Sequence, residues 1–258
     1  MISKICANLL ILNLIFVTHY AMADINRLSL DKNKGITLTS FYRSYFSRKN
    51  DGRYKLKNGK PYHIQGEGDL YGVKTSFFPS NTAFFVIDPW DNMPSAFLNK
   101  YYGNITNNYI LPLVRLAKAK GYNIYIFTNN CKDIKPVPYS CSISKKFYDL
   151  TKNTSKVKIV YWQGLDPNIF SEHLKKLGIT KIIYTGFASN MCILERPTGM
   201  FKMKSLGFSL YFIPKASAAV ELSGTWDKQY IHKAATDIIS QSLANITRFK
   251  DIHAALIR

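Results

Sequence analysis

Acidic side chains are scarce in this chain. Its 258 residues contain 16 Asp and Glu against 35 Lys and Arg, which gives a formal net charge of +19 at pH 7. Such a basic chain favours anionic partners such as nucleic acid, lipid headgroups or anionic polysaccharide. The basic residues are spread along the sequence, however, and no nucleic-acid-binding motif accompanies them. We therefore expect no nucleic-acid partner and interpret the charge as a general property of the surface.

Histidine is also sparse. Beyond residue 23 the chain has only His63, His173, His232 and His253, which are widely separated. A transition-metal site needs several such ligands to converge. We therefore expect no catalytic metal and no other cofactor.

Long apolar runs are missing after the first two dozen residues, so no later segment is long enough to cross a bilayer. The chain starts with Met1-Ile-Ser-Lys, continues with an apolar stretch to Val17, and reaches the small-x-small motif Ala21-Met-Ala23. This order is typical of a secretory signal peptide that is cleaved after Ala23. An uncleaved anchor is the competing interpretation, which the shortness of the apolar run disfavours. The sequence predicts export, to the periplasm or as a secreted protein, without stable membrane insertion.

Cysteine is rare as well, and its count is informative. Cys6 lies in the predicted leader, which leaves Cys131, Cys141 and Cys192. An odd number of cysteines in an oxidising compartment predicts one disulfide and one free thiol. Cys131 and Cys141 enclose a loop that contains proline and form the natural pair. Cys192 is then the free thiol.

Apolar residues make up 47% of the chain and aromatic residues 14%, which argues against disorder. Residues 24–80 are rich in aromatics and carry Asn58-Gly59 between short apolar-bearing segments, a signal for a hairpin. We interpret these residues as an N-terminal extension packed on the core. Residues 81–258 then form the main domain, and residues 1–23 the signal peptide.

Beyond residue 80, apolar runs alternate with amphipathic segments. Strands are predicted at about 83–88, 123–128, 157–162, 180–186 and 208–213. Helices are predicted at about 107–120, 168–177, 190–205 and 226–244. This alternation indicates an α/β fold of the three-layer, Rossmann-like type, in which helices cover both faces of a parallel sheet.

Three residues stand out as candidates for catalysis. Cys192 ends the segment Gly186-Phe-Ala-Ser-Asn-Met-Cys192, where a strand leads into a helix. A helix N-terminus favours a thiolate and can hold an oxyanion. Asp88 ends an apolar run, at the strand end where α/β proteins bind ligands. Lys158 flanks another apolar run. The structural alternatives are a buried small cysteine, a capping aspartate and a solvated lysine.

Together these residues resemble the isochorismatase-like cysteine hydrolase superfamily, in particular its nicotinamidase and N-carbamoylsarcosine amidase-like branch. The resemblance spans about residues 82–244 and includes the Gly-x-Ala-Ser-x-x-Cys segment that ends at Cys192. Lys158 fits the family spacing better than its neighbour Lys156. The chain departs from the family at Gln163-Gly-Leu-Asp-Pro167, where relatives have a Ser-Ala-Phe-like segment.

The resemblance implies a mechanism. Asp88 takes the thiol proton of Cys192, Lys158 stabilises the ionised pair, and the sulfur attacks a carbonyl or carbamoyl carbon to give a thioester that water hydrolyses. The implied oxyanion donors are the backbone N–H groups of Cys192 and Ala188, and the peptide bond between Phe187 and Ala188 is implied to be cis.

Trp90, Asp91 and Ser189 are expected to line the substrate pocket, although Trp90 is equally compatible with the core. Glu195 and Arg196 are interpreted as a local ion pair, with substrate contact as the alternative. The sequence thus predicts an exported cysteine hydrolase for a small amide, carbamoyl or ureido compound, and leaves a homo-oligomer open. The alternative function is a secreted binding protein on a hydrolase-like fold that docks to anionic surfaces.

Overall fold

The computed structural model describes residues 34–43, 56–57, 60–61, 70–131 and 142–258. Eight strands form one sheet in the order β4-β1-β10-β9-β8-β5-β6-β7. In chain order they are β1 (Ile36–Arg43), β4 (Leu70–Phe77), β5 (Thr82–Ile87), β6 (Asn123–Thr128), β7 (Val157–Tyr161), β8 (Lys181–Phe187), β9 (Ser209–Ala218) and β10 (Asn245–Ile246). Neighbouring strands from β10 to β7 pair in parallel, whereas β1 pairs antiparallel with both β10 and β4. The predicted α/β fold with a parallel sheet is therefore confirmed, and an antiparallel pair extends it.

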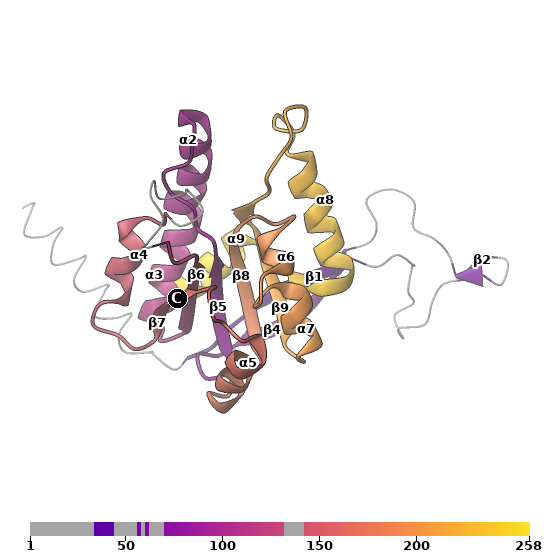
Figure 1. Ribbon diagram of the computed structural model, residues 1–258. Coiled ribbons are helices and arrows are strands. Elements are labelled where there is room, and N and C mark those ends of the chain that lie inside the picture. Colours follow the sequence, from indigo (N-terminus) through magenta and orange to yellow (C-terminus); the bar gives the residue numbers. More distant parts are fainter. Residues whose placement is uncertain (1–33, 44–55, 58–59, 62–69, 132–141) are drawn as a thin grey trace, which may run out of the picture.

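Helices cover both faces of this sheet (Figure 1). They are α2 (Ala96–Ile105), α3 (Leu111–Ala119), α4 (Lys145–Thr151), α5 (Pro167–Lys176), α6 (Cys192–Glu195), α7 (Met200–Ser205), α8 (Tyr230–Ile238) and α9 (Phe249–Ile257), with π-helical segments η1 (Thr106–Ile110) and η3 (Ile239–Leu243). Each face of the sheet has its own buried apolar cluster. Both clusters draw on β5 and β6, which are buried at every position because a central parallel strand is covered on both sides.

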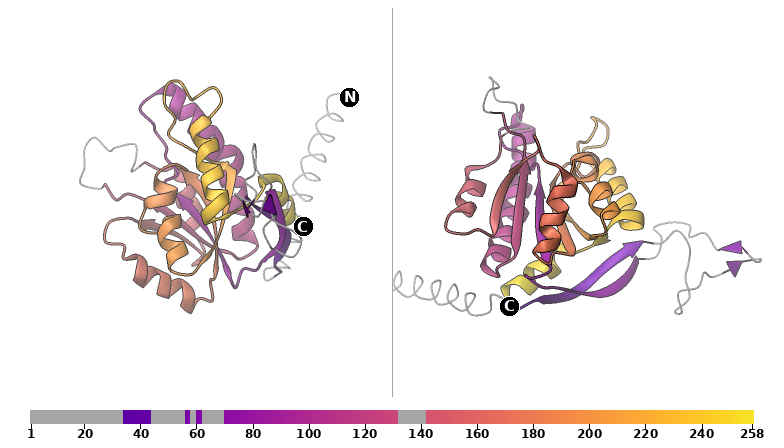
Figure 2. Two further views of the ribbon diagram at one scale, coloured as in Figure 1. Left: turned by 90° about the vertical axis from the view of Figure 1, so that its right-hand side faces the viewer. Right: turned by 60° about the horizontal axis from the view of Figure 1, so that its bottom comes forward.

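Strands β1 and β4 come from the N-terminal extension and run side by side beyond the parallel strands (Figure 2). Ile36 and Leu38 of β1 join one buried cluster, and Phe77 of β4 packs edge-on against Tyr211 of β9 at 4.7 Å. Exposed residues alternate with these buried ones, as expected for a strand pair with one covered face. The extension therefore contributes two strands to the main sheet.

The predicted hairpin turn at Asn58-Gly59 lies outside the described residues, although the two short strands that flank it pair antiparallel. They are β2 (Leu56–Lys57) and β3 (Lys60–Pro61), with Lys57 opposite Lys60. The predicted signal peptide, residues 1–23, also lies outside the described part of the chain. No helix within the described ranges is both long enough and apolar enough to span a membrane.

Two of the predicted helices differ from the observed ones. The segment predicted as one helix at 190–205 forms two short helices, because Pro197 has no N–H and disfavours a helical backbone at Arg196, whose ψ is 159°. The helix predicted to begin near residue 107 begins at Ala96 instead. Ser95 accepts a hydrogen bond from the N–H of Leu98 and so caps that start.

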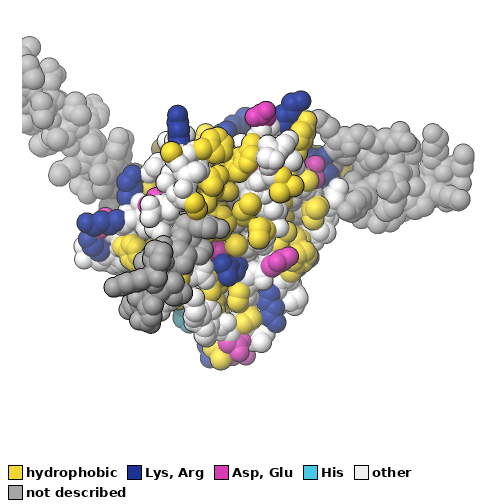
Figure 3. Space-filling view, turned by 45° about the horizontal axis from the view of Figure 1, so that its top comes forward, with side chains coloured by type: hydrophobic (Ala, Val, Ile, Leu, Met, Phe, Trp, Pro, Cys, Tyr) yellow, Lys and Arg dark blue, Asp and Glu magenta, His cyan; other side chains and the backbone are white. Residues whose placement is uncertain are grey.

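Helix α2 and the segment between β9 and α8 project beyond the sheet at the same end of the molecule (Figure 1). Phe97 and Tyr101 of α2 contact the ring of Trp226 in that segment, at centroid distances of 5.2 and 5.3 Å. Hydrophobic side chains gather on this end, and they include the exposed Phe97 and Leu222 (Figure 3). The two projections therefore form an apolar rim.

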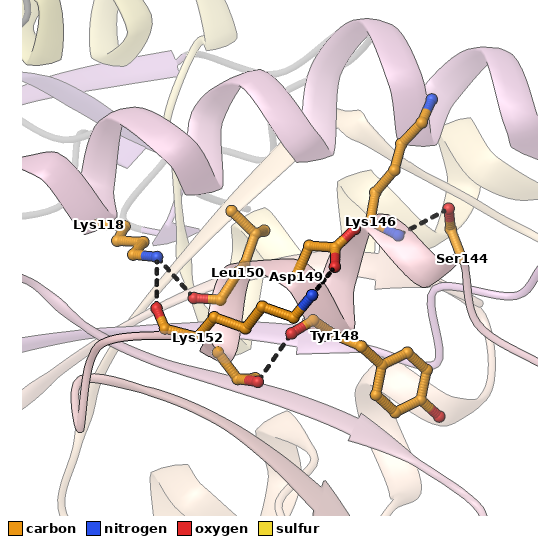
Figure 4. Close-up of polar contacts among 8 residues, drawn as sticks. Lys118, Ser144, Lys146, Tyr148, Asp149, Leu150 and Lys152 are labelled. Carbon is orange, nitrogen blue, oxygen red and sulfur yellow. Dashed lines mark hydrogen bonds and ion pairs between the residues drawn. The ribbon is translucent and has the colours of Figure 1, made fainter.

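Helix α4 is anchored to α3 just before the chain enters β7 (Figure 4). The ammonium group of Lys118 donates hydrogen bonds to the backbone oxygens of Leu150 at 2.8 Å and Lys152 at 3.3 Å. These carbonyls at the end of α4 have no partner within the helix, and a cation is favourable there. Lys152 in turn pairs with Asp149 at 2.7 Å, which lowers the pKa of that carboxyl.

Candidate active site

Asp88 follows β5 directly and is fully buried. Its backbone N–H donates to the carbonyl of Phe127 on the neighbouring strand at 3.0 Å. The backbone φ of Asp88 is 40°, a left-handed value that residues other than glycine seldom adopt. Outliers of this kind cluster at functional sites, where the surrounding structure holds them.

Cys192 is the first residue of α6 and is partly exposed. It lies in a tight turn at the end of β8, residues 186–196, which we call the elbow. Gly186 has φ of 102°, and a Cβ at this position would lie 2.0 Å from the backbone oxygen of Ile87. Only glycine fits such a close approach. The Phe187–Ala188 peptide bond is cis, as the family resemblance implied. The carbonyl of Ala188 accepts hydrogen bonds from the N–H groups of Met191 and Ile193, both at 3.1 Å, which closes the elbow.

The elbow places the thiol of Cys192 beside the carboxyl group of Asp88, close enough for each group to shift the pKa of the other. Burial raises the pKa of Asp88, while the Trp162 hydrogen bond and the Arg196 charge oppose that rise. Burial, followed by the negative charge of Asp88, raises the pKa of the Cys192 thiol to about 11. At neutral pH Cys192 is therefore a thiol, next to the buried carboxyl group of Asp88.

The raised pKa of this thiol is opposite to the expectation that the helix N-terminus favours a thiolate. Helix α6 has only four residues, so few peptide dipoles align behind the sulfur. A backbone hydrogen bond from Ala188 does lower the thiol pKa, but the cost of burying charge is larger.

Two further side chains, those of Trp162 and Arg196, donate hydrogen bonds to the carboxylate of Asp88. The indole Nε1 of Trp162 donates to Oδ1 at 2.7 Å. The guanidinium of Arg196 donates from Nε to Oδ2 at 3.1 Å, and its second nitrogen also lies 3.1 Å from Oδ2. The expected local ion pair between Glu195 and Arg196 is thus replaced by a pair between Arg196 and a residue 108 positions earlier.

The structure does not bring Lys158 to this site, which corrects the prediction of Lys158 as the third catalytic residue. Lys158 is an exposed residue of β7 that pairs with Tyr125, which in turn pairs with Phe85. That register is three residues before Asp88, or about 10 Å along the strands. Lys156, the alternative, is also exposed and lies two residues before Lys158, further from the end of the sheet at which Asp88 lies. The charged neighbours that set the pKa of Asp88 and Cys192 are Arg196 and each other.

The predicted pocket residues have different surroundings. Trp90 is buried, and its ring packs against those of Tyr102 and Phe187, so it supports the elbow at Phe187. Asp91 is exposed and accepts a hydrogen bond from the N–H of Asn92. Ser189, expected in the pocket, is fully buried.

A buried histidine that the sequence analysis did not assign to the site supports Ser189. The hydroxyl of Ser189 lies 2.8 Å from Nδ1 of His232, whose Nε2 lies 3.1 Å from the carbonyl of Pro214. Burial lowers the pKa of His232, so the ring is neutral near pH 7 and donates from Nε2 to that carbonyl. Only a tertiary contact places this ring beside the elbow.

Two further predictions stay predictions. Cys141 lies outside the described residues, so its pairing with Cys131 is open, whereas Cys192 is a free thiol. Across the described ranges no group of three or more His, Cys, Asp or Glu side chains converges as a metal site. The expectation of a metal-independent reaction is not tested by that finding.

Comparison with solved structures identifies the fold. An isochorismatase from Pseudomonas putida matches with a TM-score of 0.50 and 18% identity over 67% of this chain and 90% of that one. A pyrazinamidase/nicotinamidase from Streptococcus mutans matches with a TM-score of 0.50 and 18% identity over 65% of this chain and 100% of that one. An isochorismatase-like hydrolase from Alkaliphilus metalliredigens has a TM-score of 0.50 and 10% identity, over 68% and 98% of the two chains.

The sequence itself matches no protein-family profile and no curated protein. Identities between 10% and 18% show the fold alone. The protein therefore has a three-layer α/β fold with a mostly parallel sheet. Within that class, its fold is the one found in isochorismatases and nicotinamidases, as the sequence resemblance implied.

Proposed function

We propose that this protein is a cysteine hydrolase that cleaves the C–N bond of a small amide, carbamoyl or ureido compound. The observation that carries the proposal is the position of the Cys192 thiol beside the buried carboxyl group of Asp88, close enough for each group to shift the pKa of the other. A nucleophile within hydrogen-bond reach of a base is the arrangement that covalent catalysis needs. The matching nicotinamidase structure supports an amide as the substrate class.

The thiol pKa of about 11 sets the order of the chemical steps. The Cys192 sulfur attacks the carbonyl carbon while its proton passes to Asp88, so that no free thiolate has to build up first. The backbone N–H groups of Ala188 and Cys192 are suited to stabilise the resulting oxyanion. Asp88 then returns the proton to the leaving nitrogen, the C–N bond breaks, and a thioester remains on Cys192.

Hydrolysis of the thioester reverses these roles. Asp88, again a carboxylate, accepts a proton from a water molecule, and the oxygen of that water attacks the thioester carbon. The C–S bond breaks, the sulfur regains the proton, and a carboxylic or carbamic acid leaves. The partly exposed thiol and the exposed Met191 beside it leave the site open to a small molecule. The predicted leader supports the additional proposal that the reaction takes place outside the cytoplasm.

The test is a screen of small amides, carbamoyl compounds and ureides for release of ammonia or amine, repeated with Cys192→Ala. We expect the variant to lose at least about 10³-fold in turnover, because it lacks the sulfur that would carry the acyl group. Met191→Ala, a change in an exposed neighbour, is the matched control for local disturbance. Mass spectrometry of the wild-type protein during turnover should show an acyl group on Cys192. Retained turnover in Cys192→Ala would refute the assignment, and a wild type inactive on every compound would favour a binding role.

A further inference from the structure

The proposed function leaves open which positively charged side chain stabilises the pair of Cys192 and Asp88. The geometry points to Arg196. We propose that Arg196, four residues after Cys192 on the same elbow, is the positioning residue that holds Asp88 in its ionised form. This inference rests on the proposed function, because it concerns how the proposed base is kept ready.

The contacts of Asp88 show why a cation is required. The carboxylate is completely buried, and an isolated charge in such a place would take up a proton. Arg196 supplies two nitrogens within 3.1 Å of Oδ2, while Trp162 supplies one donor to Oδ1. Both carboxylate oxygens are therefore held by donors that favour the charged form.

Arg196 itself is suited to this task. Its side chain is 29% exposed, so water hydrates one side of the guanidinium while the other side faces Asp88. Its central carbon lies 5.2 Å from the ring of Trp162, and that ring stacks on Phe127 at 4.9 Å. This stack favours the position in which the guanidinium faces Asp88. A guanidinium also stays charged at every pH at which a protein is folded, whereas an ammonium group can lose its proton.

The local backbone explains how nucleophile and cation reach the same carboxylate. The N–H of Arg196 donates to the carbonyl of Cys192 at 3.2 Å, which closes the single turn of α6. Pro197 then forces the chain out of the helix at Arg196. The elbow thus carries both the sulfur and the positive charge, and β7 carries only Trp162 to the site.

The experiment compares Arg196→Gln, Arg196→Lys and, as the matched control, the exposed Lys158→Gln. The readout is the pH dependence of kcat/KM. Removing the positive charge raises the pKa of Asp88 further, so the acid limb of Arg196→Gln should move to higher pH. Below that limb, kcat/KM should fall about tenfold for each pH unit of the movement. Arg196→Lys keeps the charge and should restore part of the wild-type profile, which a merely structural role would not predict. Lys158→Gln should leave the profile unchanged.

A readout without turnover separates this proposal from the proposed function. The carboxyl resonance of Asp88, assigned by its loss in Asp88→Asn, is titrated by carbon NMR in the wild type and in both Arg196 variants. A higher midpoint in Arg196→Gln and an intermediate one in Arg196→Lys would support the proposal even if no amide were hydrolysed. Identical midpoints in wild type and Arg196→Gln, or a shifted profile in Lys158→Gln, would overturn it. Circular dichroism confirms that each variant is folded before either measurement.

Discussion

Replacing Trp162 with Phe tests the electrostatics of the site through stability alone. The change removes the indole donor to Asp88, a 2.7 Å hydrogen bond between buried groups, but keeps a ring that can stack on Phe127. A hydrogen bond to a charged group contributes about 1.5–3 kcal/mol. For a protein of this size, 1 kcal/mol corresponds to about 2–4 °C in Tm. We therefore expect a loss of several degrees at neutral pH.

The loss should depend on pH in a defined direction. Burial already raises the folded-state pKa of Asp88 above its usual 3.8, so ionisation of this group lowers stability as the pH rises. Trp162 opposes that effect by favouring the charged form, and its removal raises the folded-state pKa further. The difference in stability between Trp162→Phe and wild type should be largest above the folded-state pKa of Asp88 in both proteins, and it should shrink as the pH falls toward 3.8.

The assay is denaturant unfolding of both proteins at neutral pH and at about pH 4, where the charge of Asp88 matters least. Trp226→Phe is the matched control, since Trp226 contacts Phe97 and Tyr101 in the apolar rim. Its cost in stability should be the same at both pH values. Equal losses for Trp162→Phe at neutral and acid pH would refute the view that this indole stabilises an ionised carboxylate.

Two further predictions concern the elbow and the cysteines. Gly186→Ala would place a Cβ 2.0 Å from a backbone oxygen at a φ of 102°, so this variant should be insoluble or have a much lower Tm. The control is Gly164→Ala, where the new Cβ meets open space and the cost is only the strain of a positive φ. Similar Tm values for the two variants would contradict this prediction. Non-reducing mass spectrometry of the exported protein should show a chain that begins at Asp24, a Cys131–Cys141 disulfide and a free Cys192; alkylation of Cys131 and Cys141 without reductant would exclude that disulfide.

The sequence predicts the parallel part of the sheet well, because central strands are buried on both faces and appear as unbroken apolar runs. The strands predicted at 83–88 and 123–128 fall within one residue of the observed β5 and β6. Strands β1 and β4 were missed because one of their faces is exposed and their apolar residues are interrupted. Helix α9 was missed although Phe249, Ile252 and Leu256 have helical spacing, since nine residues give a weak periodic signal.

The candidate site divides in the same way between local and distant information. Asp88 and Cys192 each end a recognisable local pattern, so the sequence locates both. The contact between Asp88 and Arg196 joins residues 108 positions apart, and no local sequence pattern predicts it. The raised pKa of the thiol likewise depends on burial by the whole fold. The spacing along the sequence predicts Lys158 as the third residue, but spacing does not show that this side chain faces solvent.

Placing the cation on the elbow has a physical consequence for this site. A lysine on β7 would lie on a different strand from the nucleophile, so its distance from the sulfur could change whenever the elbow moves. Arg196 is instead one helical turn from Cys192, so any movement of the elbow shifts sulfur and charge together. Gly186 and the carbonyl of Ala188 restrict that movement, and Trp162 fixes the carboxylate from the opposite side. The geometry of the pair then depends chiefly on how β8 enters α6, and this junction is where changes in the chain should affect the site most.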